Sequence, residues 1–266
     1  MKIAHVFFIG CLFGQGIAQE TVSSRFSHDV SRTTHGSLHV MSRPFHWDTE
    51  DLLYFGVATG GAFTLYLIEQ DIRKIFLNNR SPFADSMGEI GDLYGEPITV
   101  VLLTGCIYGY GLFFDNTRMR DTAVLMSASL VPAGFIQTLS KTAAGRARPS
   151  TDDHNNIFKP FNRTEEYYSF VSGHTLVAMS ISLVLARQVN SIPLKIGFYT
   201  LGILGGVSRI YNDDHWASDV FLGAALSYAS VNTAASWLEN NQKTSAHTKN
   251  ILLHVSPTTV SLSLIW

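Results

Sequence analysis

Cysteine and charge are both scarce in this chain. With Cys11 and Cys106 as its two cysteines, the 266-residue chain has no disulfide framework of the kind that small secreted domains depend on. Charged residues make up 15% of the chain, against about 25% in a typical soluble domain. The net charge of −2 and the lack of a basic stripe exclude non-specific nucleic-acid binding, which needs a positive surface.

The sequence also lacks a cluster of metal-ligating residues. A zinc or two-metal site needs several His, Cys or carboxylate ligands at close spacings, and no such pattern is present. His154 beside Asp152 and Asp153 is loosely similar to a ligand set, but it lies in the polar stretch 149–169, which is expected to be a loop. We therefore expect these residues to be solvated, and we expect no metal and no cofactor.

The N-terminus reads as a targeting segment. Lys2 supplies the positive charge, residues 3–16 the apolar stretch and residues 16–18 the small-residue cleavage signal, so a signal peptide is predicted over residues 1–18. The alternative is an N-terminal anchor helix, for which the apolar run is short. Residues 19–47 are polar and without clear periodicity, and are interpreted as a leader.

Long apolar segments follow, separated by short charged stretches. Their length and their Ala, Leu and Gly content favour helices over strands, which predicts an all-α bundle of about six apolar helices in a domain over residues 48–240. The six segments are Leu52–Ile68, Ile98–Phe114, Thr122–Leu139, His174–Ala186, Ile196–Val207 and Val220–Val231.

The lengths of these segments leave open whether they span a membrane. The first three hold 17 or 18 uncharged residues each, near the lower limit for a span of about 20 residues. The last three hold 12 or 13, which also suits the buried helices of a soluble bundle. The mean hydropathy of +0.14 favours a membrane protein without deciding the matter.

The C-terminal tail, residues 241–266, has a different pattern. From Val260 onward, apolar and polar residues alternate behind a Pro257-Thr-Thr turn, which predicts a short strand at the terminus. The alternative is a frayed tail.

The first motif is Lys141-Thr-Ala-Ala-Gly-Arg-Ala-Arg148-Pro149. Lys141 and Arg148 are seven residues apart, so two helical turns place both cations on one face. Arginine offers a fork for two phosphate oxygens and lysine a compact charge, which indicates a phosphate site. Alone, the motif is also compatible with a cationic helix C-terminus that complements the helix dipole.

The second motif is Ser172-Gly173-His174, directly before an apolar segment. Ser172 suits the N-cap of a helix, and the free amides at a helix start attract anions. Gly173 allows the backbone to approach a ligand closely, and His174 would lie in the first turn. A serine cap followed by an incidental histidine explains this fragment equally well.

The third motif is Ser208-Arg209 followed, after five residues, by His215-Trp-Ala-Ser-Asp219. On a helix His215 and Asp219 are an i,i+4 pair, so the carboxylate would hold one imidazole nitrogen and leave the other as nucleophile or base. Arg209 would reach the same anion. A structural His–Asp pair is the alternative for this fragment alone.

In combination, the motifs Lys-x6-Arg-Pro, Ser-Gly-His and Ser-Arg-x5-His-x3-Asp resemble the signature of the type 2 phosphatidic acid phosphatase (PAP2) / vanadium haloperoxidase superfamily. The resemblance covers roughly Leu52 to Glu239. One departure is visible: the family usually has Pro before Ser-Gly-His, and Val171 stands there in this chain. Valine lacks the fixed φ of proline, but no catalytic group is lost.

The resemblance implies a metal-independent mechanism. His215 would attack phosphorus and become a phosphohistidine, Asp219 would orient it, and His174 would protonate the leaving alkoxide. Phosphoryl transfer depends mostly on positioning and charge stabilisation, which cations and a helix N-terminus supply. The phosphate-binding residues implied are Lys141, Arg148, Ser172, Gly173 and Arg209.

The resemblance also implies the partners and the compartment. Apolar helices around the site favour a phosphorylated lipid in a membrane, such as phosphatidic acid, phosphatidylglycerol phosphate, undecaprenyl pyrophosphate or lipid A. A soluble periplasmic acid phosphatase acting on small phosphate esters is the main alternative. A vanadium haloperoxidase and an inactive membrane scaffold are the others, although intact Lys141, His174, His215 and Asp219 argue against the scaffold.

We expect a bacterial cell-envelope protein with a periplasm-facing site. The predicted signal peptide and six membrane spans do not agree with a site that faces the periplasm. Cleavage after Ala18 would put the mature N-terminus outside the cytoplasm, and six full spans would then place the motifs on the cytoplasmic side. A periplasmic site requires an N-terminus inside, one segment that does not span, or a soluble bundle.

Overall fold

Helices dominate the computed structural model, which describes residues 21–152, 154–249, 251–256 and 259–264. The predicted all-α class is confirmed, and the six apolar segments coincide with helices α2 and α4 to α8, the second of them ending one residue beyond α4. The signal peptide predicted over residues 1–18 lies outside the described residues. In chain order the α-helices are α1 (Val22–Ser42), α2 (Thr49–Asn78), α3 (Pro82–Gly95), α4 (Pro97–Phe113), α5 (Thr117–Ala144), α6 (Gly173–Gln188), α7 (Ile192–Tyr211) and α8 (Ala217–Lys249). Short 3-10 helices are η1 (Arg43–His46), η2 (Pro149–Thr151) and η3 (Glu165–Tyr167).

Local signals determine where the helices start and stop. Asp48 and Asp51 form a reciprocal capping box that begins α2, and the side chain of Asn116 caps α5. Gly145 ends α5 with a φ of 55°, and a Cβ there would lie 1.8 Å from the carbonyl oxygen of Lys159. Only glycine fits this left-handed position. The chain therefore turns away from the helix axis directly after the last turn of α5, which carries Lys141.

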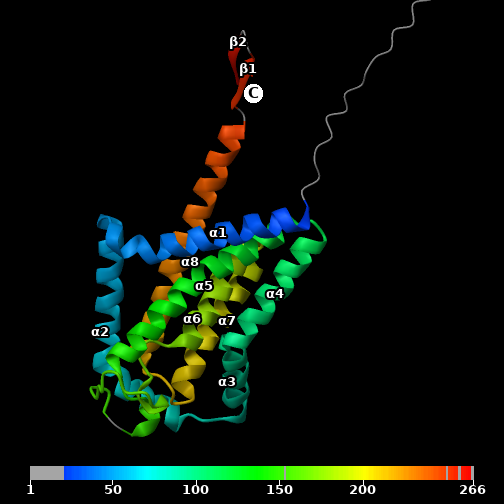
Figure 1. Ribbon diagram of the computed structural model, residues 1–266. Coiled ribbons are helices and arrows are strands. Elements are labelled where there is room, and N and C mark those ends of the chain that lie inside the picture. Colours follow the sequence, from blue (N-terminus) through cyan, green and yellow to red (C-terminus); the bar gives the residue numbers. More distant parts are fainter. Residues whose placement is uncertain (1–20, 153, 250, 257–258, 265–266) are drawn as a thin grey trace, which may run out of the picture.

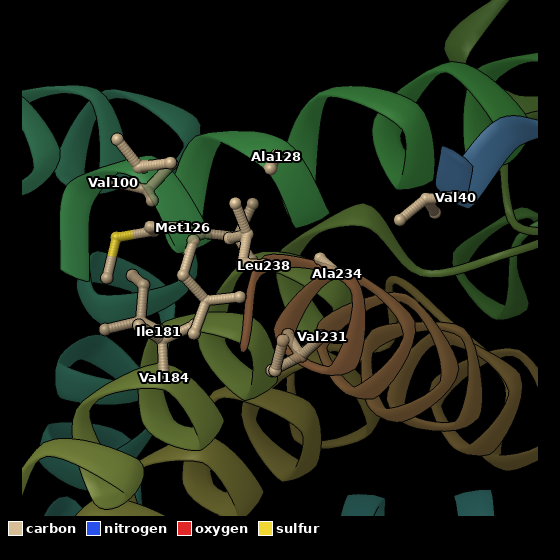
Figure 2. Close-up of a cluster of buried hydrophobic side chains, with 13 residues drawn as sticks. Val40, Val100, Met126, Ala128, Ile181, Val184, Val231, Ala234 and Leu238 are labelled. Carbon is tan, nitrogen blue, oxygen red and sulfur yellow. The ribbon is translucent and has the colours of Figure 1, made fainter. Parts of the chain in front are cut away.

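The hydrophobic core lies among α5, α6 and α8, the helices that carry most of the motif residues at their ends. Figure 2 shows the buried side chains interlocking between them. Alanines at the contact, such as Ala128 and Ala234, let the helix backbones approach closely. Dense packing of this kind gives the helix ends a fixed relative position. The cluster includes Val40, Val100, Val124, Leu125, Met126, Val177, Ile181, Val184, Val231 and Leu238.

The outer helices expose apolar side chains. Leu53, Val57 and Leu67 of α2 are 69%, 63% and 65% exposed. By length and composition α2 and α5 can each cross a membrane, and the pair α3–α4, bent by 56°, would add a third span if it crosses as one. Contiguous apolar surface of this extent suits lipid rather than water, so the chain has the helices of a membrane protein.

Residues 22–42, which the sequence analysis assigned to a polar leader, are instead the helix α1. It lies across the end of the bundle opposite the loop 145–172 (Figure 1). Gly36 packs against Ala128 of α5 and Trp237 of α8, where a Cβ would come within 3.2 Å of the Ala128 methyl group. The helix was not predicted from the sequence, because its buried residues are Asp29, Gly36 and Val40 and do not form a row of large apolar side chains.

The C-terminal residues form a two-stranded antiparallel hairpin after α8. Strand β1 (Ile251–Ser256) pairs with β2 (Thr259–Leu264), with Val255 opposite Val260. The predicted strand from Val260 is confirmed as β2. Its partner β1 was not predicted, because its sequence Ile-Leu-Leu-His-Val-Ser does not alternate.

Candidate active site

All three motifs meet at one end of the bundle, beside the loop 145–172 (Figure 1). The first motif ends α5, the second begins α6, and the third joins the end of α7 to the start of α8. The core described above fixes these helix ends relative to one another. The sequence analysis predicted this convergence from the motifs.

His215 is almost completely buried, with 2% of its surface exposed. Its Nδ1 donates a hydrogen bond to the carbonyl oxygen of Ser169 at 2.6 Å, which leaves Nε2 with a free lone pair. Burial lowers the pKa of His215 well below its usual range, and the charges of Lys141, Arg209 and Arg148 lower it further. The imidazole is therefore held in the neutral form that a nucleophile needs.

The predicted hydrogen bond between Asp219 and His215 is wrong. Helix α8 begins only after His215, so the i,i+4 geometry does not apply to this pair. Asp219 instead accepts hydrogen bonds from Nη1 of Arg146 at 2.6 Å, from Oγ of Ser169 at 2.6 Å and from the backbone N–H of Trp216 at 3.2 Å. Asp219 thus acts on His215 through Ser169, whose carbonyl holds the imidazole.

The arginines of the site are paired with carboxylates in this structure. Asp214 contacts both of them, Arg148 at 3.0 Å and Arg209 at 2.7 Å, and Asp92 of α3 binds Arg209 at 2.6 Å. The Nε atoms of both arginines are buried without a hydrogen-bond partner among the described residues. Lys141 is half-buried on the last turn of α5, close enough for its charge to act on His215. The guanidinium groups therefore retain unused donors for an anion.

The start of α6 is built as predicted. Ser172 is its N-cap, with Oγ accepting a hydrogen bond from the backbone N–H of Thr175 at 3.4 Å. Gly173 opens the helix, and a Cβ there would lie 3.3 Å from Nε2 of Gln137. The same Gln137 amide donates to the carbonyl of Val171 at 2.9 Å. Gln137 thereby braces the loop at the position where proline was expected.

His174 follows in the first turn of α6. Its Nε2 donates to a carboxylate oxygen of Glu96 at 3.2 Å, and Glu96 lies at the bend between α3 and α4. Burial lowers the pKa of His174, as does the charge of Arg209, whereas Glu96 and Asp92 raise it. The protonation of His174 is therefore set by a balance in which Glu96 opposes the effect of burial.

The sequence analysis missed three residues that support the site. Arg146 is a third cation inside the motif that runs from Lys141 to Arg148, which is a signal that the sequence does contain. Glu69, buried at the end of an apolar segment, was a weaker signal. Ser169 offered none, because its contact with His215 is made by the main-chain carbonyl, which every residue has.

No group of three or more His, Cys, Asp or Glu side chains is arranged to hold a metal ion within the part of the chain that the structure describes. His154 contacts Gln70 at 3.3 Å and Asp152 binds Arg73 at 2.9 Å, while Asp153 lies outside the described residues. The loosely ligand-like residues of the loop are thus engaged with other partners.

Comparison with known proteins identifies the family of this bundle. Residues 122–243, from α5 to α8, match the family described as the PAP2 superfamily. This part of the chain, which carries all three motifs, belongs to the PAP2 superfamily.

Individual relatives agree with this assignment. The lipid A 1-phosphatase of Porphyromonas gingivalis is 24% identical over 161 residues, which are 60% of this chain and 32% of that protein. The chain thus spans about a third of the length of this curated relative. A transmembrane PAP2 type phosphatidylglycerolphosphate phosphatase from Bacillus subtilis superposes with a TM-score of 0.55 at 22% identity, over 71% of this chain and 94% of the other. LpxE of Aquifex aeolicus gives a TM-score of 0.50 at 19% identity, over 63% and 94%.

Proposed function

We propose that this protein is a metal-independent phosphatase that removes phosphate from a lipid phosphate ester through a phosphohistidine at His215. One observation carries the proposal. A buried neutral imidazole, held at Nδ1 by the Ser169 carbonyl, lies under the combined charge of Lys141, Arg148 and Arg209. With Nδ1 fixed by a hydrogen bond, Nε2 of the imidazole is free to attack phosphorus. The three cations favour binding of the phosphate group and stabilise the charge of the transition state.

The first step forms the phosphoenzyme. Nε2 of His215 attacks phosphorus in line, the bond from phosphorus to the ester oxygen breaks, and the leaving alkoxide takes a proton from the imidazolium of His174. In the second step water attacks the phosphohistidine and gives its proton to His174. The P–N bond then breaks, which releases inorganic phosphate and returns His215 to its neutral form.

The three cations stabilise the transferring group. Guanidinium groups bind phosphate oxygens through paired N–H donors, and a lysine adds a point charge. Because Asp92 and Asp214 hold Arg209 and Arg148 now, a phosphate dianion would have to share or replace these contacts. The amides of Gly173 and the residues that follow would add the favourable end of the α6 dipole.

A lipid substrate is supported by the surface of the bundle and by the relatives. The exposed apolar side chains of α2 and the candidate spans support a bundle that is embedded in lipid, with the site at one end of it. The relatives are named as phosphatases of lipid A and of phosphatidylglycerol phosphate. We infer a location in the bacterial cell envelope, with the site facing the periplasm.

The test is phosphate release by the full chain purified in detergent, with EDTA present. We expect turnover of phosphatidylglycerol phosphate or lipid A to exceed that of p-nitrophenyl phosphate, and vanadate to inhibit as a transition-state analogue. The variant His215→Asn is the control for contaminating phosphatases. Loss of activity with EDTA that magnesium or zinc restores would contradict the mechanism, and a preference for the small ester would favour a soluble-type acid phosphatase.

A further inference from the structure

A chain of buried charges connects α2 to the active-site loop. Glu69 of α2, Arg146 and Asp219 are 1%, 2% and 0% exposed. Arg146 lies between the two carboxylates: Nη1 donates to Asp219 at 2.6 Å, and Nη2 donates to Glu69. Ser218 completes the cluster, because its Oγ donates to Glu69 at 2.5 Å and accepts from Arg146 at 2.8 Å.

The guanidinium of Arg146 is fixed on every side. Its Nε and Nη2 donate to the carbonyl oxygen of Asn155 at 3.1 and 3.0 Å. Three aromatic rings surround its central carbon, Tyr66 at 5.3 Å and both Phe158 and Trp216 at 5.6 Å. Burying three charges seldom adds stability over well-packed apolar residues, so a cluster this complete suggests a requirement for geometry.

The cluster reaches the nucleophile through Ser169. The backbone N–H of Ser169 donates to the carbonyl of Arg146 at 3.1 Å, and its Oγ donates to Asp219 at 2.6 Å. These two bonds fix the peptide whose carbonyl accepts the Nδ1 proton of His215. Arg146 thus acts on Ser169 twice, directly through its main chain and indirectly through Asp219.

We propose that Arg146, held by Glu69, is the positioning residue that fixes the tautomer and orientation of His215. The proposal rests on His215 being the nucleophile of the proposed function. Without Arg146, the carboxylates of Asp219 and Glu69 would be buried without a countercharge, and like charges repel strongly at low dielectric. Asp219 would then move, and Ser169 would lose the side-chain bond to Asp219 while keeping its main-chain bond to residue 146. The Ser169 carbonyl that accepts the Nδ1 proton of His215 would shift with it.

The expected kinetic effect falls on turnover rather than on binding. The phosphate-binding groups Lys141, Arg148 and Arg209 stay in place, so KM and the inhibition constant of vanadate should change little. Misplacement of a reacting group by about 1 Å costs about 100-fold in rate. We therefore expect Arg146→Met to lower kcat by about 100-fold.

The matched control is Asp29→Asn. Asp29 is also 2% exposed and is paired with two arginines, Arg32 and Arg120, but it lies between α1 and α5 at the far end of the bundle. We expect Asp29→Asn to lower the thermal midpoint without changing kcat per folded protein. Arg146→Lys keeps the charge but cannot reach Glu69, Ser218 and Asp219 together, and should lower kcat less than Arg146→Met.

A second readout does not depend on activity. In a sample with 15N-labelled histidine, the hydrogen-bonded Nδ1 proton of His215 gives a downfield signal that His215→Asn identifies. It should persist in Asp29→Asn and disappear or shift upfield in Arg146→Met, or in Arg146→Lys if the methionine variant does not fold.

The outcomes separate the two proposals. An inactive wild type that keeps the downfield signal, with that signal lost in Arg146→Met, overturns the proposed function and leaves the positioning role standing. An active wild type with unchanged kcat and an unchanged signal in the Arg146 variants overturns the positioning role. A fall in kcat no larger than the loss of folded protein, as for a purely structural residue, overturns it as well.

Discussion

Among the described residues, the ionic clusters around Asp29 and around Arg146 lie at opposite ends of the bundle, and they differ in how completely they are bonded. At the end covered by α1, Asp29 contacts Arg32 and Arg120, each at 3.4 Å. Nε and Nη1 of Arg120 are buried without a hydrogen bond to the described residues. Arg32 also contacts Asp121 of α5 at 2.6 Å, so this cluster holds α1 against α5, but the contacts of Asp29 itself are long.

In the Arg146 cluster at the other end the bonds are short, and each nitrogen of the Arg146 guanidinium donates a hydrogen bond. Arg146 contacts Asp219 at 2.6 Å, and Ser218 contacts Glu69 at 2.5 Å. This cluster leads through Ser169 to His215, whereas the Asp29 cluster contacts none of the three motifs. Under the proposed function, the feature that distinguishes the Arg146 cluster is its connection to His215, because both clusters bury charge to a similar extent.

Replacing His215 should have the largest effect. His215→Asn removes the nucleophile, so we expect kcat to fall by several orders of magnitude, about 10⁶-fold in the comparable case of a protease serine or histidine. Phosphate release measured in detergent tests this. Retained turnover within tenfold of wild type would remove His215 from the chemistry.

Asp219→Asn should follow. Asparagine keeps the shape but loses the charge that balances Arg146 and holds Ser169, and we expect a loss of roughly 10²–10⁴ in kcat by analogy with serine-protease triads. Vanadate should still bind, because the three phosphate-binding cations remain. The measurements are kcat and the thermal midpoint of the same purified variant, which together separate a loss of rate from a loss of folded protein. A wild-type kcat would contradict the role of Asp219.

His174→Ala should affect substrates unequally. A p-nitrophenolate leaves without a proton, whereas an alkoxide needs one, so the variant should lose about 10²–10⁴ on an alkyl phosphate and less on p-nitrophenyl phosphate. The comparison of kcat/KM on the two esters is the measurement, because this ratio covers the steps up to release of the alcohol and leaves out the hydrolysis of the phosphohistidine, which both esters share. An equal loss on both would mean that His174 does not act as the acid.

Glu96→Gln tests the balance at His174. The Glu96 carboxylate raises the pKa of His174, so its removal lowers that pKa and the imidazolium is lost at lower pH. The pH profile of kcat on an alkyl phosphate should therefore shift its basic limb toward lower pH, while the profile on p-nitrophenyl phosphate stays in place. If the pH profiles on both esters stay in place, Glu96 does not control the protonation of His174 as the general acid.

Asp29→Asn should have the smallest effect on turnover. Breaking a buried ion pair costs about 3–5 kcal/mol of stability, so the thermal midpoint should fall. The distance of this cluster from the site predicts an unchanged kcat per folded protein. A specific loss of kcat here would mean that the two clusters do not differ as described.

The sequence predicted those parts of the fold and the site that rest on local patterns. Apolar runs located six helices, and motif spacing brought His174, His215 and the cations to one place. Helix α1 was missed, because its packing uses Gly36 and a buried Asp29 rather than an apolar stripe.

The connection between Asp219 and His215 was misassigned for a different reason. The exact start of α8 decides whether the two residues share a helix, and helix boundaries are not determined by sequence to within a residue. The true path runs from Asp219 to the hydroxyl of Ser169 and from the main-chain carbonyl of Ser169 to His215. Asp219 is held in turn by Arg146, which is paired with Glu69 on α2, far from the motifs in sequence. No local pattern encodes such a contact.

The central claim is the covalent intermediate on His215, and trapping it is the most direct test. The full chain in EDTA is mixed with a 32P-labelled lipid phosphate and quenched within milliseconds in alkali or denaturant. Our account predicts protein-bound label that is stable to alkali and labile to acid, that maps to His215 and that is absent in His215→Asn. Label on another residue, or turnover by wild type with no trapped phosphoenzyme and equal activity in His215→Asn, would contradict it.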